Sequence, residues 1–260
     1  MGRERSVRWV VGGDLSEVSH RLARHVTALA RRSVKARGRF RFVLAGGNTP
    51  RELYRELAEE QPTFPWRRTW VYFGDDRLVP PKDPNSNFRM CRESFLSRVR
   101  VPTSQVVRVR GEMRPPSLAV ENYANRLAST LEGPPPWFDL VLLGIGEDGH
   151  TASLFPSFPQ LTEQEKLVAL VRRSPEPPRL PRATLTLPAL TSSKEVCFLT
   201  SGEGKAKAVR GIYRSLPRGS FRFPASLIAA RAPTRFYLDR EAATGLPLAL
   251  QRKGGRGGQE

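Results

Sequence analysis

The chain has 260 residues, of which 39% are hydrophobic and 26% are charged. This length suffices for one large α/β domain or two small ones, and the composition is that of a globular chain rather than a disordered one. The longest apolar runs, such as residues 140–145, are far shorter than the ~18 residues of a membrane span. Residues 1–5 lead into no apolar segment of a signal peptide. We therefore expect a cytoplasmic protein with no membrane partner.

The cysteines and the charge narrow the class of protein further. Cys91 and Cys197 stand far apart with no C-x-x-C spacing, so the sequence offers neither a disulfide framework nor a zinc ribbon. The net charge of +18 comes from 43 basic and 25 acidic residues, and the basic residues are scattered over the whole length. We interpret most of them as solvated surface residues and expect no specific nucleic-acid partner, with weak polyanion binding as the alternative.

Strand-like apolar runs alternate along the chain with amphipathic segments of helical spacing. The predicted strands span residues 8–11, 40–45, 70–73, 140–144, 167–171, 183–187, 196–200 and 236–238, and the predicted helices span residues 15–36, 50–60, 87–99, 118–131 and 205–214. This alternation predicts a single α/β domain over residues 7–250, with a mostly parallel sheet flanked by helices. Residues 100–116 and 157–181 are predicted surface loops, and the Gly- and Arg-rich residues 251–260 are a predicted disordered tail.

Sites in parallel sheets form where loops leave the carboxyl ends of strands, and three such segments carry polar residues. The first, Gly46-Gly47-Asn48-Thr49, follows a predicted strand and precedes Pro50, a residue suited to the first position of a helix. Two glycines before a helix N-terminus allow free backbone N–H groups to approach an anion closely. The segment is therefore a candidate phosphate site, with an ordinary strand-to-helix turn as the alternative.

The second segment, Asp75-Asp76-Arg77, follows the predicted strand over residues 70–73. Adjacent carboxylates beside an arginine are common on protein surfaces, where they are solvated and contribute little. At the carboxyl end of a strand they can instead orient a base and present a guanidinium group to an oxyanion or a phosphate. Asn85 or Ser86 is the candidate cap of the helix that follows.

The third segment runs from Gly144 to Pro156. Its glycines satisfy the pattern G-x-G-x-x-G, but Pro156 leaves little room for a helix and the strand lies in the middle of the chain, so we reject dinucleotide binding. The turn offers a different chemistry, because it projects Asp148 and His150 together.

Histidine is scarce, since the chain has only three. His20 and His25 lie on the first predicted helix, where we expect surface or groove residues, and no H-E-x-x-H metal motif is present. His150 remains as the candidate general base, because an imidazole titrates close to neutral pH. Either Asp75 or Asp148 could fix its tautomer. Since no G-x-S-x-G nucleophile elbow occurs, we expect His150 to activate a water molecule.

Taken together, the three segments resemble those of the 6-phosphogluconolactonases. Residues 46–50 are similar to that family's G-G-[ST]-T-P turn, residues 75–80 to its D-E-R-x-V-P motif, and residues 144–156 to its G-x-G-x-D-G-H-x-A-S-L-F-P motif. Further similar segments lie at residues 182–186, 202–205, 224–226 and 237–243, so the resemblance covers nearly the whole chain. The departures from the family pattern are Asn48 for a small hydroxyl residue, Asp76 for Glu and Ser157 for Gly.

This resemblance implies a modified Rossmann-like α/β fold and hydrolysis of 6-phospho-D-glucono-1,5-lactone to 6-phospho-D-gluconate, a step of the oxidative pentose phosphate pathway, without a metal or coenzyme. We expect His150 to deprotonate water, Asp148 to orient the imidazole and Arg77 to stabilise negative charge. The candidate catalytic residues are His150, Asp148, Arg77 and Asp75, and the residues implied for the phosphate are Gly46, Gly47, Asn48, Thr49, Arg182 and Lys205. The partner is a phosphorylated sugar lactone, and the chain is expected to be a monomer or a homodimer.

Two alternative functions have weaker support. The amino-sugar phosphate deaminases share the first turn and the D-G-H segment, but this chain has Arg77 where that family's pattern has Tyr, and Ser153-Leu154-Phe155 where its acidic run would stand. A sugar-phosphate sensor domain of a transcriptional regulator would carry a helix-turn-helix module, for which the residues before the first predicted strand leave no room.

Overall fold

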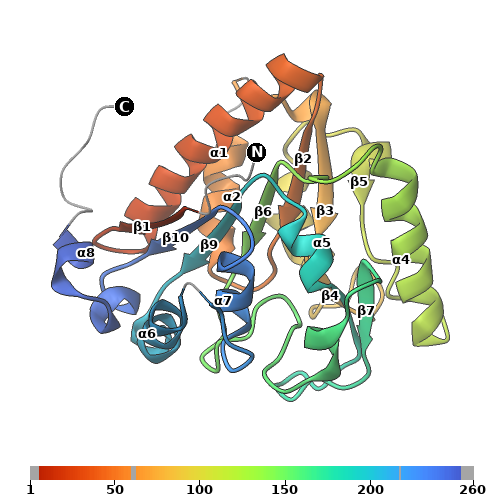
Figure 1. Cartoon of the computed structure of the whole chain (residues 1–260). Helices are drawn as coiled ribbons and strands as arrows, with labels where there is room; N and C mark the ends of the chain where they lie inside the picture. The colour runs from red at the N-terminus through yellow and green to blue at the C-terminus, as the bar shows by residue number, and fades with distance from the viewer. Residues whose placement is uncertain (1–5, 60–62, 217, 253–260) are drawn as a thin grey trace.

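The computed structural model describes residues 6–59, 63–216 and 218–252, and its centre is a seven-stranded sheet (Figure 1). The strands are, in spatial order, β1 (Val7–Val11), β10 (Thr234–Leu238), β9 (Val196–Thr200), β6 (Leu140–Leu143), β2 (Phe40–Leu44), β3 (Thr69–Phe73) and β5 (Val106–Val107). Each strand pairs with its neighbours in parallel. This arrangement confirms the predicted fold class, an α/β domain built on a mostly parallel sheet.

Helices cover both faces of the sheet, and the strands contribute side chains to both cores. In β2, Phe42 packs in the core that contains α1 (Leu15–Arg37) and α2 (Pro50–Glu59), whereas the next residue, Val43, packs in the opposite core. The helices of the opposite face are α4 (Pro116–Thr130), α5 (Leu187–Thr191), α6 (Ala206–Ser215) and α7 (Pro224–Ala229). Burial on both faces explains why these strands read as continuous apolar runs.

β2 and β6 are neighbours in the sheet, and the chain adds its later strands in opposite directions from these two. From β2 the chain proceeds outward to β3 and β5, and from β6 it proceeds in the other direction to β9 and β10. Loops that leave such a pair of strands diverge, so a crevice forms at the carboxyl ends of the strands. The topology therefore directs the search for a site to the loops after β2 and β6.

A second, three-stranded sheet lies beyond the carboxyl end of β3 (Figure 1). Its strands β4 (Asp75–Arg77), β8 (Arg182–Leu185) and β7 (Val168–Val171) pair in antiparallel fashion. β7 and β8 correspond to the strands predicted over residues 167–171 and 183–187, but they lie outside the parallel sheet. The reason is the connection between β7 and β8, which contains no helix, because a parallel pair requires a long crossover.

Smaller differences concern the ends of elements. The helix predicted over residues 87–99 is an α-helix only over α3 (Asn87–Cys91) and continues as a π-helical turn over Arg92–Leu96. The predicted loop over residues 100–116 contains β5, whose two valines pair with β3. The last helix, α8 (Leu248–Arg252), includes the first two residues of the predicted tail, and residues 253–260 lie outside the described residues.

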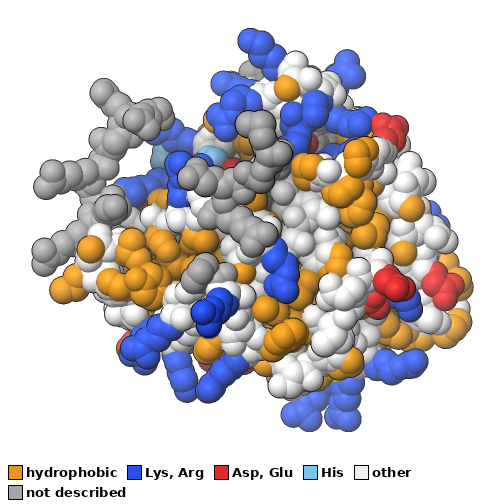
Figure 2. Space-filling view, in the orientation of Figure 1, with side chains coloured by type: hydrophobic (Ala, Val, Ile, Leu, Met, Phe, Trp, Pro, Cys, Tyr) orange, Lys and Arg blue, Asp and Glu red, His pale blue; other side chains and the backbone are white. Residues whose placement is uncertain are grey.

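Lys and Arg side chains are spread over the visible face of the molecule rather than gathered into one patch (Figure 2). Several form ion pairs with a carboxylate four residues away in the chain, such as Arg89 with Glu93 at 2.7 Å and Arg108 with Glu112 at 2.6 Å. This distribution agrees with the interpretation of the basic residues as a solvated surface. Of the helices in the described residues, none combines the length and the apolar character that crossing a membrane demands.

Candidate active site

A cavity of about 640 Å³ opens at the carboxyl ends of the neighbouring strands β9, β6, β2 and β3. The segments predicted from the sequence meet there, although they come from distant parts of the chain. The predicted site residues that line it are Gly46, Gly47, Asn48, Thr49, Asp75, Arg77, His150, Arg182 and Lys205. The cavity therefore collects nine of the ten predicted residues, and the tenth, Asp148, is in contact with His150.

The turn between β2 and α2 presents unpaired backbone donors to this cavity. Within the described ranges, the N–H groups of residues 46–49 donate no hydrogen bond to the protein. A Cβ atom at Gly46 would lie 2.2 Å from the amide of Asn87, so only glycine fits there. The Asn48 Oδ1 accepts a hydrogen bond from Arg51 Nε at 3.2 Å, so this side chain braces the start of the helix. Free N–H groups at a helix N-terminus are suited to an anion.

Two guanidinium groups reach the cavity from the second sheet. Arg77 lies opposite Arg182 in the β4–β8 pair. Arg77 Nη1 donates to the carbonyl of Asn85 at 2.8 Å, and the Arg182 guanidinium lies over the Phe155 ring, 5.5 Å from its centroid. The Nε of each arginine is buried without a hydrogen-bond partner, and neither arginine forms an ion pair with a described carboxylate. Burial lowers the pKa of Arg182.

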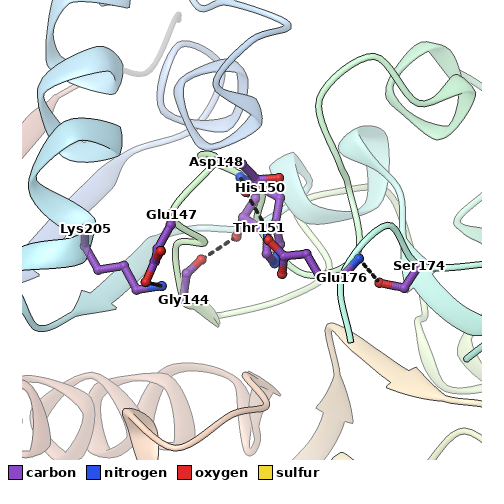
Figure 3. Close-up of polar contacts among 8 residues, drawn as sticks. All are labelled: Gly144, Glu147, Asp148, His150, Thr151, Ser174, Glu176 and Lys205. Carbon is purple, nitrogen blue, oxygen red and sulfur yellow. Dashed lines mark hydrogen bonds and ion pairs between the residues drawn. The ribbon is translucent and has the colours of Figure 1, made fainter. Parts of the chain in front are cut away.

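Asp148 and His150 meet on the turn after β6 (Figure 3). Asp148 Oδ1 lies 2.6 Å from His150 Nδ1 and also accepts the backbone N–H of His150 at 2.9 Å. Burial opposes the ionisation of Asp148, but the hydrogen bonds from the His150 ring and backbone outweigh it and lower the pKa of this carboxyl group. An ionised carboxylate only accepts hydrogen bonds, so Nδ1 carries a proton, and in the neutral form of the ring Nε2 carries the lone pair.

The His150 ring is held by packing as well as by Asp148. It lies 4.6 Å from the Phe155 ring, between centroids, and its side chain is 14% exposed. The N–H of Gly146 donates to the His150 carbonyl at 2.8 Å, and a Cβ at Gly146 would lie 2.0 Å from the Nδ1 atom. Thr151 Oγ1 closes the turn by donating to the Gly144 carbonyl at 2.8 Å. The turn therefore fixes both the position and the orientation of the imidazole.

Either Asp75 or Asp148 was expected to orient the His150 ring, and the hydrogen bonds of Asp75 distinguish the two. Its Oδ2 accepts the hydroxyl of Ser153 at 2.6 Å, and its Oδ1 lies 3.4 Å from the Asn87 amide nitrogen. The hydrogen bonds described for Asp75 include none with His150. Asp148 is thus the carboxylate that orients the ring, and Asp75 is a buried wall of the cavity, 7% exposed.

Asp76 supports the site from behind. It accepts the backbone N–H groups of Asn87 at 2.7 Å and Phe88 at 3.1 Å, at the start of α3. Burial raises the pKa of Asp76 to about 7, against the opposing effect of these hydrogen bonds. Ser86 caps the same helix by accepting the Arg89 N–H at 3.2 Å, as predicted.

The family model of the glucosamine-6-phosphate isomerases and 6-phosphogluconolactonases matches residues 13–237. The chain belongs to this family. Among curated relatives, the 6-phosphogluconolactonase of Synechocystis is 34% identical over 224 residues, which cover 85% of this chain and 90% of the relative. The human 6-phosphogluconolactonase is 39% identical, with 84% of each chain covered. The resemblance predicted from the motifs is therefore confirmed.

Solved structures of the family agree with the fold. The 6-phosphogluconolactonase of Thermotoga maritima is 29% identical, with a TM-score of 0.79 over 90% of this chain and 100% of that chain. The Trypanosoma brucei enzyme of the same name is 27% identical, with a TM-score of 0.83 over 93% and 99%. A monomeric glucosamine-6-phosphate deaminase shares the fold at 22% identity and a TM-score of 0.79.

In this member of the 6-phosphogluconolactonase family, the sequence did not reveal every polar group of the cavity. Ser153 and Asn87, which hold Asp75, were not predicted, because small polar residues carry no distinctive pattern. Glu176 was also missed, since it lies in the segment predicted as a surface loop. Its Oε1 lies 3.7 Å from His150 Nδ1. The available signal was a single charged residue between two prolines, because proline restricts the backbone of the residue before it.

In the part of the chain that the structure describes, two clusters of side chains bring potential metal ligands together. In the cavity, ligand atoms of Asp148, His150 and Glu176 lie within 4.8 Å of one another, and away from it the same holds for His25, Glu195 and Cys197. In both clusters the histidine ring is within hydrogen-bond distance of a carboxylate. In the cavity, Asp148 is hydrogen-bonded to His150 Nδ1. In the other cluster, Glu195 accepts hydrogen bonds from His25 at 3.0 Å and from Arg235.

Proposed function

We propose that this protein hydrolyses 6-phospho-D-glucono-1,5-lactone to 6-phospho-D-gluconate in the oxidative pentose phosphate pathway. The observation that carries the proposal is the contact of 2.6 Å between Asp148 and His150 Nδ1, in a cavity that also presents free N–H groups and two guanidinium groups without an ion pair to a described carboxylate. The Asp148–His150 pair is suited to activate water. The N–H and guanidinium groups are suited to bind a phosphate. Relatives named 6-phosphogluconolactonase, which the chain matches over most of its length, support the same substrate.

His150 acts as the general base in this proposal. Its Nε2 takes a proton from water while the water oxygen forms a bond to the lactone carbonyl carbon, and Asp148 stabilises the resulting imidazolium. The bond between that carbon and the ring oxygen then breaks, and the proton passes from His150 to the ring oxygen. The carboxylic acid formed ionises at neutral pH. General-base help is worth ~10²–10⁴-fold in rate.

Groups at the ends of β2, β8 and β9 hold the phosphate. The N–H groups of residues 46–49 and the cations of Arg182 and Lys205 line the same cavity. Arg77 stabilises the negative charge that develops on the lactone oxygen, since its guanidinium faces the cavity without an ion pair to a described carboxylate. The phosphate thereby fixes the lactone in one orientation, which raises the fraction of encounters that place its carbonyl at His150.

The proposal is tested by hydrolysis of freshly generated 6-phosphogluconolactone, coupled to 6-phosphogluconate dehydrogenase, with the spontaneous rate subtracted. The wild type should be active, and the rate of His150→Ala should fall toward the spontaneous background. His20→Ala is the matched control, because the His20 side chain is 63% exposed and lies outside the cavity. An inactive wild type refutes the reaction, and full activity in His150→Ala refutes the base.

We further propose that the reaction requires neither a metal nor a coenzyme and takes place in the cytoplasm. The two cysteines are free and buried, which suits a reducing compartment. Treatment with a chelator should leave the rate unchanged. A loss of activity that a divalent cation restores would contradict the metal-free mechanism.

A further inference from the structure

Glu176 brings a second carboxylate to His150. It comes from the connection between β7 and β8, on the side of the imidazole opposite Lys205 in Figure 3. Glu176 Oε1 lies 3.7 Å from His150 Nδ1, and its side chain is 43% exposed at the edge of the cavity. The carboxylate therefore lies in the same cavity as the imidazole that is the general base in the function proposed above.

The backbone on both sides of Glu176 is restricted. The Glu176 N–H donates to the Oγ atom of Ser174 at 3.2 Å, and Ser174 is buried. Pro175 and Pro177 flank Glu176, and Pro177 itself lines the cavity. Proline fixes its own φ and restricts the backbone of the residue before it, so the direction in which the Glu176 side chain leaves the backbone is restricted.

The charge of Glu176 is not neutralised by a direct ion pair. Among the described residues its only ion-pair partner within 4.0 Å is His150, and the Asp148 carboxylate lies within 4.8 Å. Arg182 attracts the carboxylate from a greater distance, and Lys205 faces Glu147 instead, at 3.9 Å. The charge of Asp148 differs, because it is engaged in two hydrogen bonds with His150.

The proposed reaction changes the charge at this place. The lactone is uncharged at its carbonyl carbon, and hydrolysis turns that carbon into a carboxylate. While His150 carries the proton taken from water, the Glu176 charge faces a cation and attracts it. Once the proton has left, the same charge faces the new carboxylate of the product and repels it.

We propose that Glu176 discriminates against the carboxylate product and so promotes its release. This inference rests on the proposed function, since it requires 6-phosphogluconate to occupy the cavity. Glu176 is a specificity residue in this role, because it neither transfers a proton nor holds the phosphate. Its contribution is the difference between two affinities of the cavity. One is the affinity for the lactone, whose ring is uncharged, and the other is the affinity for 6-phosphogluconate, which carries a carboxylate as well as the phosphate.

The test compares two probes by calorimetry, 6-phosphogluconate and glucose 6-phosphate, which is cyclic and carries no carboxylate. In Glu176→Gln, the Kd for 6-phosphogluconate should fall about fivefold, as expected for a charge pair at a half-exposed site, while that for glucose 6-phosphate changes less than about twofold. Glu176→Asp, which keeps the charge, should resemble the wild type. Added salt should shrink the difference.

Glu165→Gln is the control, because it removes one negative charge from the exposed segment before β7, outside the cavity. It should leave both Kd values unchanged. An equal shift of both probes in Glu176→Gln, or no shift of either, overturns the inference. An inactive wild type refutes the lactonase proposal instead, so the two failures are distinguishable.

Discussion

Arg77 and Arg182 lie directly opposite each other in the antiparallel pair β4–β8, and both reach the same cavity. Like charges in this relationship destabilise a sheet, and neither guanidinium has an ion-pair partner among the described carboxylates. Repulsion between the two guanidinium groups therefore destabilises the folded protein, and an anion bound between them would remove this repulsion. This relationship indicates an anion site more strongly than either arginine does alone.

Replacing Arg182 should separate affinity from stability. In Arg182→Met, we expect KM for the lactone to rise about tenfold or more, because a charge-assisted hydrogen bond to the phosphate is lost. The melting temperature should stay constant or rise, since the like-charge neighbour of Arg77 is removed. Arg179→Met, an exposed residue outside the cavity, is the control. An unchanged KM in Arg182→Met would exclude this residue from the phosphate site.

Two glycines of the same turn should respond differently to alanine. A Cβ at Gly146 would lie 2.0 Å from His150 Nδ1, whereas a Cβ at Gly144 would meet nothing within 4 Å. Gly146→Ala should therefore displace the imidazole and lower kcat about tenfold or more, with the fold retained. Gly144→Ala should keep wild-type kcat. Steady-state kinetics and circular dichroism of both variants check this, and equal kcat values would contradict the placement of His150.

Asp148→Asn tests whether the carboxylate acts through its charge. The Asn oxygen can still accept from His150, so we expect the turn to persist and KM to remain within about threefold of the wild type. The imidazolium formed during hydrolysis loses its counter-charge, and kcat should fall about a hundredfold. The split between kcat and KM is the measurement. A large rise in KM with unchanged kcat would assign Asp148 to binding instead.

The buried carboxyl of Asp76 should make stability depend on pH. Its pKa of about 7 in the folded protein exceeds its ordinary value of 3.8, so the folded state binds this proton more tightly than the unfolded chain. This contribution is complete below about pH 4 and is lost as pH rises to about 7. Denaturant unfolding between about pH 5 and about pH 8 should therefore show a flatter profile for Asp76→Asn than for the wild type. Parallel profiles would show that Asp76 does not titrate in this range.

Much of the site was predictable because its parts are local. The glycines before Pro50 and the spacing of Asp148 and His150 are properties of short segments, whose turns bring neighbouring residues together whatever the rest of the chain does. Apolar runs of strand length likewise marked β2, β3, β6 and β9. The rule that parallel strands end at one edge of the sheet then placed these segments side by side.

The sequence by itself therefore determined the fold class, three of the loops that form the cavity and the placement of Asp148 and His150 on one turn. Only the tertiary structure decided that Asp75 bonds to Ser153 rather than to His150, and that β7 and β8 form a separate sheet with β4. It also brought Glu176 to the imidazole and Arg182 opposite Arg77. These relationships join segments far apart in the chain, and hydrophobic periodicity and turn chemistry carry no information about which distant segments become neighbours.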